Sequence, residues 1–272
     1  MRFLLVFFLL VISGATSLAE TNFFLEGNLV QGGLVKGRAA PGSKIFWESR
    51  PVPVTPTGEF IIGFGRDADQ RQRLKVIAPT GDERLEELTL ANRTYQVERI
   101  NGISKRMMNP SESELKRIAE EAEEIGRVRA HASALTHFLE PFDWPVMGRI
   151  SGVYGSQRIF NGEPRRPHYG IDIAAPAGTI VTAPAGGLVS LAHQDMFFSG
   201  KTLVLDHGSG LTSSFLHLQQ ILVAVGDRIE KGQPIATVGA TGRVTGPHLD
   251  WRVNWFEQRL DPALLVPGMP GG

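Results

Sequence analysis

A histidine and an aspartate four residues apart, His168 and Asp172, have side chains that could bind a metal. Gly170 and the β-branched Ile171 and Ile173 disfavour a helix and predict an extended strand. Residues i and i+4 of a strand point to the same face, so the two side chains can converge. An imidazole with a carboxylate suits a divalent ion such as zinc. Taken alone, the pair more often marks a buried, hydrogen-bonded His–Asp pair.

Two later motifs add histidines: Leu216-His217-Leu218 and Gly246-Pro247-His248-Leu249-Asp250. His248 and Asp250 are two apart on a predicted strand, so both side chains point to one face. In order and spacing, the three motifs resemble the lysostaphin-type (LytM-like) zinc peptidases, which cut peptidoglycan cross-bridges. The resemblance runs from about residue 148 to 262 and includes glycine-rich segments such as Tyr154-Gly155-Ser156.

The resemblance implies a site for Zn²⁺ in a groove of an antiparallel β-sheet. It assigns His168, Asp172 and Asp250 as metal ligands. His248 would be the general base that positions the water, and His217 would bind the oxyanion or orient the water. Three further residues could shape the groove or have purely structural roles, namely Arg158, Asn161 and Tyr169.

Asp250 departs from the family pattern, which usually ends in His-x-His. A carboxylate oxygen can ligate zinc about as closely as an imidazole nitrogen. Zinc with one histidine and two aspartates would carry no net charge, whereas two histidines and one aspartate leave about one positive charge. We therefore expect a weaker Lewis acid that tolerates harder ions such as manganese better.

Residues 1–19 are predicted to be a signal peptide, with Arg2, the apolar run Phe3 to Ile12, and the cleavage site Ser17-Leu18-Ala19. The alternative is an uncleaved membrane anchor, although the run is short for a bilayer span. The chain has no cysteine, which excludes a lipoprotein and disulfides. We expect a periplasmic or secreted protein of the cell envelope, without a stable transmembrane anchor.

Three regions follow the predicted signal peptide. Short apolar runs between turn residues predict an immunoglobulin-like β-sandwich over 21–100. A capping box at Ser111 and Glu114 and apolar residues at three-four spacing predict a helical linker over 110–139. This helix either lies on one of the two domains or covers the groove and regulates access. The peptidase domain is predicted over 145–265, so the fold class is mainly β.

The balance of charged residues argues against one class of function, nucleic-acid binding. Lys and Arg total 28 and Asp and Glu total 28, so no basic excess indicates a nucleic-acid partner.

Our first hypothesis is an exported zinc metalloendopeptidase that hydrolyses peptide cross-links of peptidoglycan. The alternative is a non-catalytic relative that binds peptidoglycan or activates another wall-hydrolase or envelope division protein. A purely structural envelope protein would leave the ordered histidines unexplained.

Overall fold

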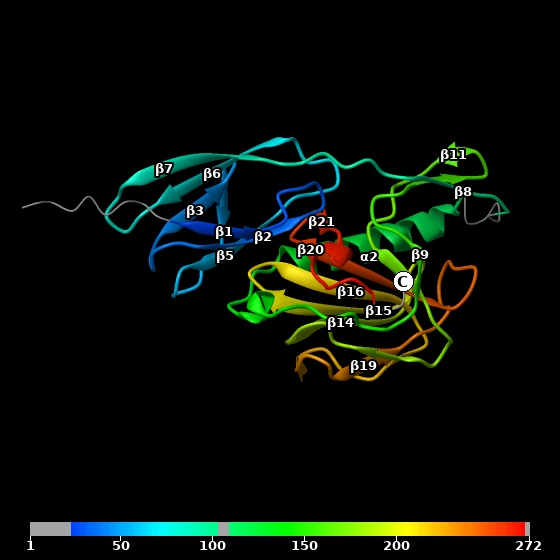
Figure 1. The fold of residues 1–272 in the computed structure, drawn as a ribbon. Coiled ribbons are helices and arrows are strands. Elements are labelled where there is room, and N and C mark those ends of the chain that lie inside the picture. The colour runs from blue at the N-terminus through cyan, green and yellow to red at the C-terminus, as the bar shows by residue number, and fades with distance from the viewer. Residues whose placement is uncertain (1–22, 103–108, 270–272) are drawn as a thin grey trace, which may run out of the picture.

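The computed structural model describes residues 23–102 and 109–269 (Figure 1). The predicted signal peptide, residues 1–19, lies outside these residues. Within the described residues, no helix has both the length and the apolar character needed to span a bilayer. Strands dominate the structure, and the prediction of a mainly β protein is confirmed.

The N-terminal strands form two small antiparallel sheets, drawn in blue and cyan in Figure 1. One has the order β1-β2-β5 and the other β4-β3-β6-β7. Their bounds are β1 Phe24–Gly27, β2 Leu34–Arg38, β3 Lys44–Trp47, β4 Arg50–Val52, β5 Glu59–Gly63, β6 Arg71–Ile77 and β7 Glu83–Thr89. Two antiparallel sheets agree with a sandwich, and its immunoglobulin-like topology stays a prediction.

The C-terminal region is built on an eight-stranded antiparallel sheet of order β18-β14-β15-β16-β20-β12-β9, with β21 paired to β20. The bounds are β9 Arg149–Gly152, β12 Ile171–Ala174, β14 Gly187–Met196, β15 Gly200–Gly208, β16 Leu211–Leu218, β18 Arg228–Ile229, β20 His248–Trp255 and β21 Gln258–Leu260. A three-stranded sheet β13-β19-β17 lies beside it, from Ile180–Thr182, Pro234–Thr237 and Gln220–Ile221.

Strand β8, Val97–Ile100, differs from its predicted place at the end of the first domain. It pairs in parallel with β10, Gln157–Phe160, which in turn pairs with β11, Glu163–Pro164. The chain therefore crosses into the C-terminal region before residue 100, and local strand propensity could not reveal this non-local partner.

Helix α2 runs over Glu112–Ala130 and begins at the predicted capping box, in which Ser111 and Glu114 bond each other's backbone N–H. It ends well before the predicted limit of 139. His131 is already extended, and only a 3-10 helix over His137–Leu139 follows. Residues 131–136 contain no run of strong helix formers that would carry the helix across this interval.

One face of α2 packs on the C-terminal sheet. Ile125 and Val128 contact a small cluster of Leu191, Met196 and Val204. The Glu121 carboxylate accepts hydrogen bonds from the Phe197 backbone N–H at 2.8 and 3.0 Å. These contacts fix the helix against β14 and β15.

The two regions share one hydrophobic core, because buried residues from both belong to a single contiguous cluster. Trp47 of β3 meets Trp255 of β20 edge to face, with ring centroids 5.4 Å apart. A Cβ built on Gly63 would lie 2.8 Å from atoms of both Trp255 and Leu260, so the β5 backbone lies directly against this sheet. The N-terminal strands are thus packed on the C-terminal sheet.

Replacing Trp255 should therefore destabilise the whole molecule. Trp255 is fully buried, and its indole N–H donates to the Ser209 carbonyl at 3.1 Å. We expect Trp255→Ala to lower the free energy of unfolding by about 3–5 kcal/mol, measured by urea denaturation. Leu85→Ala, at a 69% exposed position, is the control and should change it little. Equal midpoints for the two variants would show that the core does not depend on Trp255.

His207 belongs to a strand, although it directly precedes a sequence typical of a turn. It lies in β15 and is fully buried, with its ring nitrogens 2.7 Å from the Gly186 carbonyl and 2.8 Å from Ser213 Oγ. Burial lowers the pKa of His207 to about 4, although the Gly186 carbonyl opposes the shift. The next three residues, Gly208-Ser209-Gly210, are typical of a turn, so local sequence preference alone does not predict a strand at His207.

His207 should make stability fall in mild acid. The unfolded chain binds this proton near pH 6.5, whereas the folded chain resists it until about pH 4. The His207 contribution is thus complete above pH 6.5 and decreases as pH falls towards 4, by up to about 3 kcal/mol. Urea midpoints between pH 7 and 4.5 should fall less steeply for His207→Gln than for wild type or for His131→Gln, the exposed control. Parallel profiles for all three proteins would contradict the assignment.

Candidate metal centre

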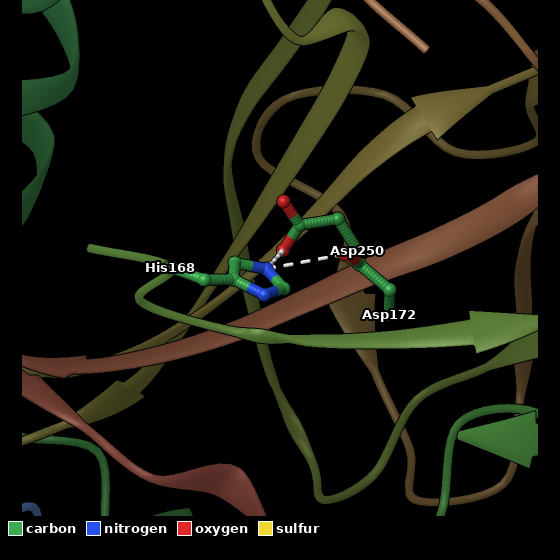
Figure 2. A group of neighbouring side chains, drawn as sticks. All are labelled: His168, Asp172 and Asp250. Atoms are coloured by element: carbon green, nitrogen blue, oxygen red, sulfur yellow. Dashed lines mark ion pairs between the residues drawn. The ribbon is translucent and has the colours of Figure 1, made fainter. Parts of the chain in front are cut away.

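His168, Asp172 and Asp250 converge on one point, as Figure 2 shows. Their potential ligand atoms all lie within 4.8 Å of one another. His168 Nε2 lies 3.1 Å from Asp172 Oδ1 and 3.6 Å from Asp250 Oδ1. Asp172 in β12 lies directly opposite Asp250 in β20, and His168 approaches from the loop before β12. The strand pairing explains why residues 78 positions apart meet.

This group has the electrostatic character of a cation site. Two carboxylates directly opposite each other on neighbouring strands repel unless a positive charge lies between them. Within the described residues, both His168 nitrogens and Asp172 Oδ1 are buried without a well-formed hydrogen bond. Burial opposes a charged imidazole, but the Asp250 and Asp172 carboxylates outweigh it and raise the pKa of His168. One imidazole and two carboxylates therefore fit a divalent metal.

Arg252 is the site residue that sequence reasoning missed. Its Nε lies 3.0 Å from Asp250 Oδ1 and its Nη2 lies 2.6 Å from Asp250 Oδ2, a two-pronged ion pair. Burial alone would raise the pKa of Asp250, but Arg252 and His168 outweigh it and hold the pKa well below its usual range. Residues two apart on a strand point to the same face, so the sequence Asp250-x-Arg252 could have indicated this pair.

The Asp250–Arg252 pair changes the expected charge of the site. An aspartate paired with a guanidinium carries no net charge, as a neutral histidine does. The centre therefore has the charge of a site with two histidines and one aspartate, in contrast to the neutral site expected from the ligand types alone. The contact between Asp250 and Arg252 lies outside the ligand motif, so the motif alone does not indicate this charge.

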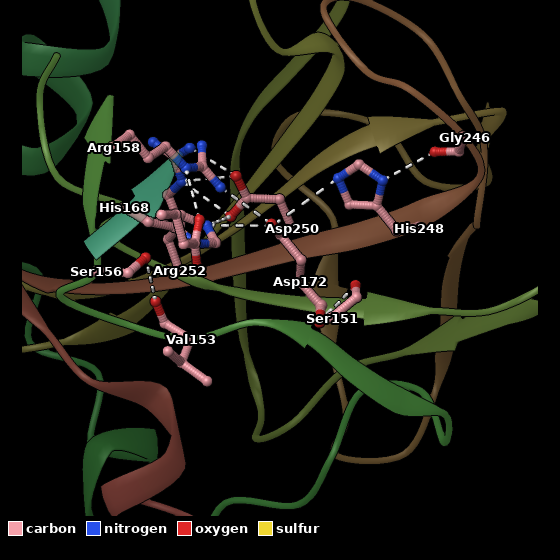
Figure 3. Close-up of polar contacts among 11 residues, drawn as sticks. Ser151, Val153, Ser156, Arg158, His168, Asp172, Gly246, His248, Asp250 and Arg252 are labelled. Carbon is pink, nitrogen blue, oxygen red and sulfur yellow. Dashed lines mark hydrogen bonds and ion pairs between the residues drawn. The ribbon is translucent and has the colours of Figure 1, made fainter. Parts of the chain in front are cut away.

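Arg158 supports the other carboxylate. Its Nη2 lies 3.1 Å from Asp172 Oδ2, and its Nε lies 3.6 Å from Glu98 Oε2 in β8. Figure 3 shows Arg158 and Arg252 on one side of the carboxylates and His248 on the other. Each aspartate thus holds an arginine while Oδ1 faces the common centre.

His217 and His248 flank the group with their rings 5.0 Å apart. His217 Nδ1 lies 2.9 Å from the Thr241 carbonyl, and His248 Nδ1 lies 2.9 Å from the Gly246 carbonyl. A carbonyl can only accept, so each Nδ1 carries a proton, and Nε2 is the nitrogen of each ring at which a proton can be taken up or released. His248 Nε2 lies 3.8 Å from Asp172 Oδ1. The two Nδ1 contacts thus fix the orientation of both rings beside the cluster.

His217 is held in a demanding conformation. It is the last residue but one of β16 and has a φ of 64°, which is uncommon for a residue other than glycine, and its backbone N–H donates to the Ser199 carbonyl at 2.8 Å. Burial is the main cause that lowers the pKa of His217, despite the opposing charge of Asp250. A neutral ring suits a proton acceptor or a residue that orients water better than an oxyanion donor.

A groove with a volume of about 790 Å³ contains this centre, and α2 forms one of its walls. Its lining includes Asp172, His217, His248 and Asp250, and it includes Arg129 of α2. The groove is also lined by Arg158, whereas Asn161 and Tyr169 are not among its lining residues. Helix α2 thus lies with its apolar face on the C-terminal region, which was one of the two predicted positions, and it also lines the groove.

The fold and the site together define the class. An antiparallel sheet brings three potential acidic and imidazole ligands together and places two further histidines beside them, an arrangement that suits a metal-dependent hydrolase.

Comparison with known proteins agrees with this class. The model of peptidase family M23 matches residues 166–262. A crystal structure of a putative peptidase M23 from Pseudomonas aeruginosa superposes with a TM-score of 0.66 and 31% identity, over 88% of this chain and 95% of that one. The chain belongs to peptidase family M23, and the resemblance seen in its three motifs is confirmed.

Two curated relatives are the peptidoglycan DD-endopeptidases ShyA and ShyC of Vibrio cholerae. ShyA is 35% identical over 127 residues, which is 44% of this chain and 29% of ShyA. ShyC is 41% identical over 104 residues, which is 38% of this chain and 24% of ShyC. The matched part thus spans less than a third of either relative.

Proposed function

We propose that this protein is an exported zinc metalloendopeptidase that hydrolyses peptide cross-links of peptidoglycan. The observation that carries the proposal is the convergence of His168, Asp172 and Asp250, with buried unpaired atoms, beside two histidines whose Nδ1 atoms bond backbone carbonyls. The names of the relatives ShyA and ShyC support the substrate. Action on the wall requires a location in the cell envelope, which the predicted signal peptide would provide.

In this proposal His168, Asp172 and Asp250 hold the ion. When bound, the ion would polarise the scissile carbonyl and the attacking water. His248 takes the proton of the water at Nε2, because its Nδ1 is already committed to the Gly246 carbonyl. His217 orients the water from the other side through its own Nε2. Arg252 and Arg158 keep the two carboxylates in place.

The test is metal-dependent hydrolysis of isolated sacculi. The purified protein should release soluble peptides, stop after treatment with a chelator, and recover on addition of Zn²⁺. Liquid chromatography with mass spectrometry of the products would identify the bond that is cut. His168→Ala is the matched inactive control. Release that continues unchanged in the chelator would contradict a metal-dependent mechanism.

A second candidate function is binding of peptidoglycan, or activation of another wall hydrolase, without catalysis. The Asp250–Arg252 ion pair favours it, because Arg252 already balances the charge of Asp250 without any metal. Two results together would establish this function: no metal bound at any zinc concentration tried, and retained binding to sacculi. Bound metal with hydrolysis would exclude it.

The domain arrangement has a proposed role as well. The N-terminal strands would act as a spacer or interaction module, and α2 would restrict access to the groove from the wall that it forms. The peptidase part would extend over the predicted region 145–265.

A further inference from the structure

The groove is cationic although the chain as a whole has no net charge. Its lining contains seven arginines and only five aspartates and glutamates. Each acidic lining residue already has an arginine as ion-pair partner: Glu98, Glu121, Asp172, Asp250 and Glu257. The excess positive charge therefore comes from arginines beyond these pairs.

Three arginines gather at one end of the groove, beyond the metal centre. Arg252 and Asn254 follow Asp250 on the same face of β20, and Arg259 lies opposite Asn254 on β21. Arg129 reaches down from α2, and its Nη2 lies 3.2 Å from Ser214 Oγ, opposite Arg252 on β16. This group is called the arginine cluster below, and it consists of Arg129, Arg252, Asn254 and Arg259.

Donors in the arginine cluster lack acceptors. Asn254 is only 2% exposed, and within the described residues its Nδ2 has no hydrogen-bond partner. Arg129 Nε is also buried without a partner there. Neither Arg129 nor Arg259 has an ion pair with a described residue, and Arg259 lies over the Tyr169 ring. Buried donors without acceptors are costly, so a ligand that accepts hydrogen bonds would be stabilised here.

The electrostatics agree with that geometry. Burial, together with repulsion from Arg259 and Arg252, lowers the pKa of Arg129 to about 9. Burial, followed by repulsion from Arg252, also lowers the pKa of Arg259. An anion placed among these guanidinium groups would relieve the repulsion between them.

We propose that the arginine cluster is a subsite that binds a free carboxylate of the peptide substrate, and this rests on the proposed function. Asp250 and Asn254 are four strand residues apart, which is about 13 Å. An extended peptide in the groove advances by about 3.3 Å per residue, as the strand does, so two of its residues span the distance to Arg252 and four span the distance to Asn254. The carboxylate therefore belongs to a group two to four residues from the bond held at the metal. A peptide with this carboxylate amidated is a poor ligand.

The closing experiment measures equilibrium binding, so it does not depend on hydrolysis. A soluble wall muropeptide with free carboxylates is titrated into the chelator-treated full chain by calorimetry, and the same muropeptide with amidated carboxylates is titrated in parallel. We expect the amidated form to bind at least about tenfold more weakly, as for a lost charge-assisted contact. Arg259→Gln should remove the difference, and Arg228→Gln, an equal charge change outside the groove, should keep it.

Asn254→Asp provides a second test that introduces the anion into the cluster itself. This isosteric change should raise the melting temperature and abolish the preference for the free carboxylate. Inorganic phosphate serves as a probe for a general anion site: it should compete with the muropeptide only weakly. Equal binding of both muropeptides to wild type, a lower melting temperature for Asn254→Asp, or strong competition by phosphate would each overturn the proposal. If sacculi are not hydrolysed but the free muropeptide is still preferred, only the proposed catalytic function fails.

Discussion

Asp250→Ala should lose the metal, with affinity for Zn²⁺ reduced by more than about 100-fold. Only His168 and Asp172 would remain as ligands. In addition, Arg252 would lose the carboxylate that it binds at 2.6 Å, which leaves a guanidinium without its counter-ion beside a divalent cation. Metal content after dialysis, measured by inductively coupled plasma spectrometry, gives the result directly.

The role of Arg252 makes the restoring variant a double substitution. Asp250→His alone restores the usual ligand of the family but leaves Arg252 unpaired, so it should bind zinc poorly. Asp250→His combined with Arg252→Gln removes the surplus charge and should regain the metal. A single Asp250→Ala protein that keeps one equivalent of zinc and full activity would show that Asp250 is not a ligand.

His217→Ala should lower turnover on sacculi by about 100-fold or more while the metal content stays near that of wild type. The ring adjoins His248 but does not belong to the ligand group, and its Nδ1 is bonded to the Thr241 carbonyl. The measurement is the initial rate of peptide release at saturating substrate, with metal analysis of the same preparation.

His193→Ala is the matched control, since His193 lies on β14 and does not line the groove. It should keep both rate and metal. Loss of metal in His217→Ala would instead place His217 among the ligands, and an unchanged rate would remove it from the catalytic group.

Part of the metal group follows from strand periodicity: His248 and Asp250 are two apart on β20, which places both on one face. His168 was expected on the same strand as Asp172, but it lies in the loop before β12, so the path of that loop and not the strand period brings the two together. The convergence of Asp172 with Asp250 depends on the pairing of β12 with β20, which only the resemblance to a family indicated. That non-local pairing is the step for which local patterns carry no information.

Other parts of the site depend on tertiary contacts, which the periodicity of the sequence does not predict. The wall formed by α2 arises from packing of Ile125 and Val128 on a sheet that begins some twenty residues later. The charge of the centre depends on whether Arg252 turns towards Asp250 or to solvent, and the sequence permits both. Burial of the His207 ring depends on the neighbouring strand and on Phe142, whose ring centroid lies 5.0 Å away, and neither contact can be read from the local sequence.

The meeting of Trp47 and Trp255 also limits how this protein can be dissected. A fragment that begins near residue 110 would remove β3 and β5 and expose one face of Trp255 and Leu260 to water. Such a fragment is expected to aggregate on expression, whereas the longer chain should unfold in a single calorimetric transition. The N-terminal strands would then act as a built-in folding partner of the catalytic sheet, inherited with it as one cooperative unit.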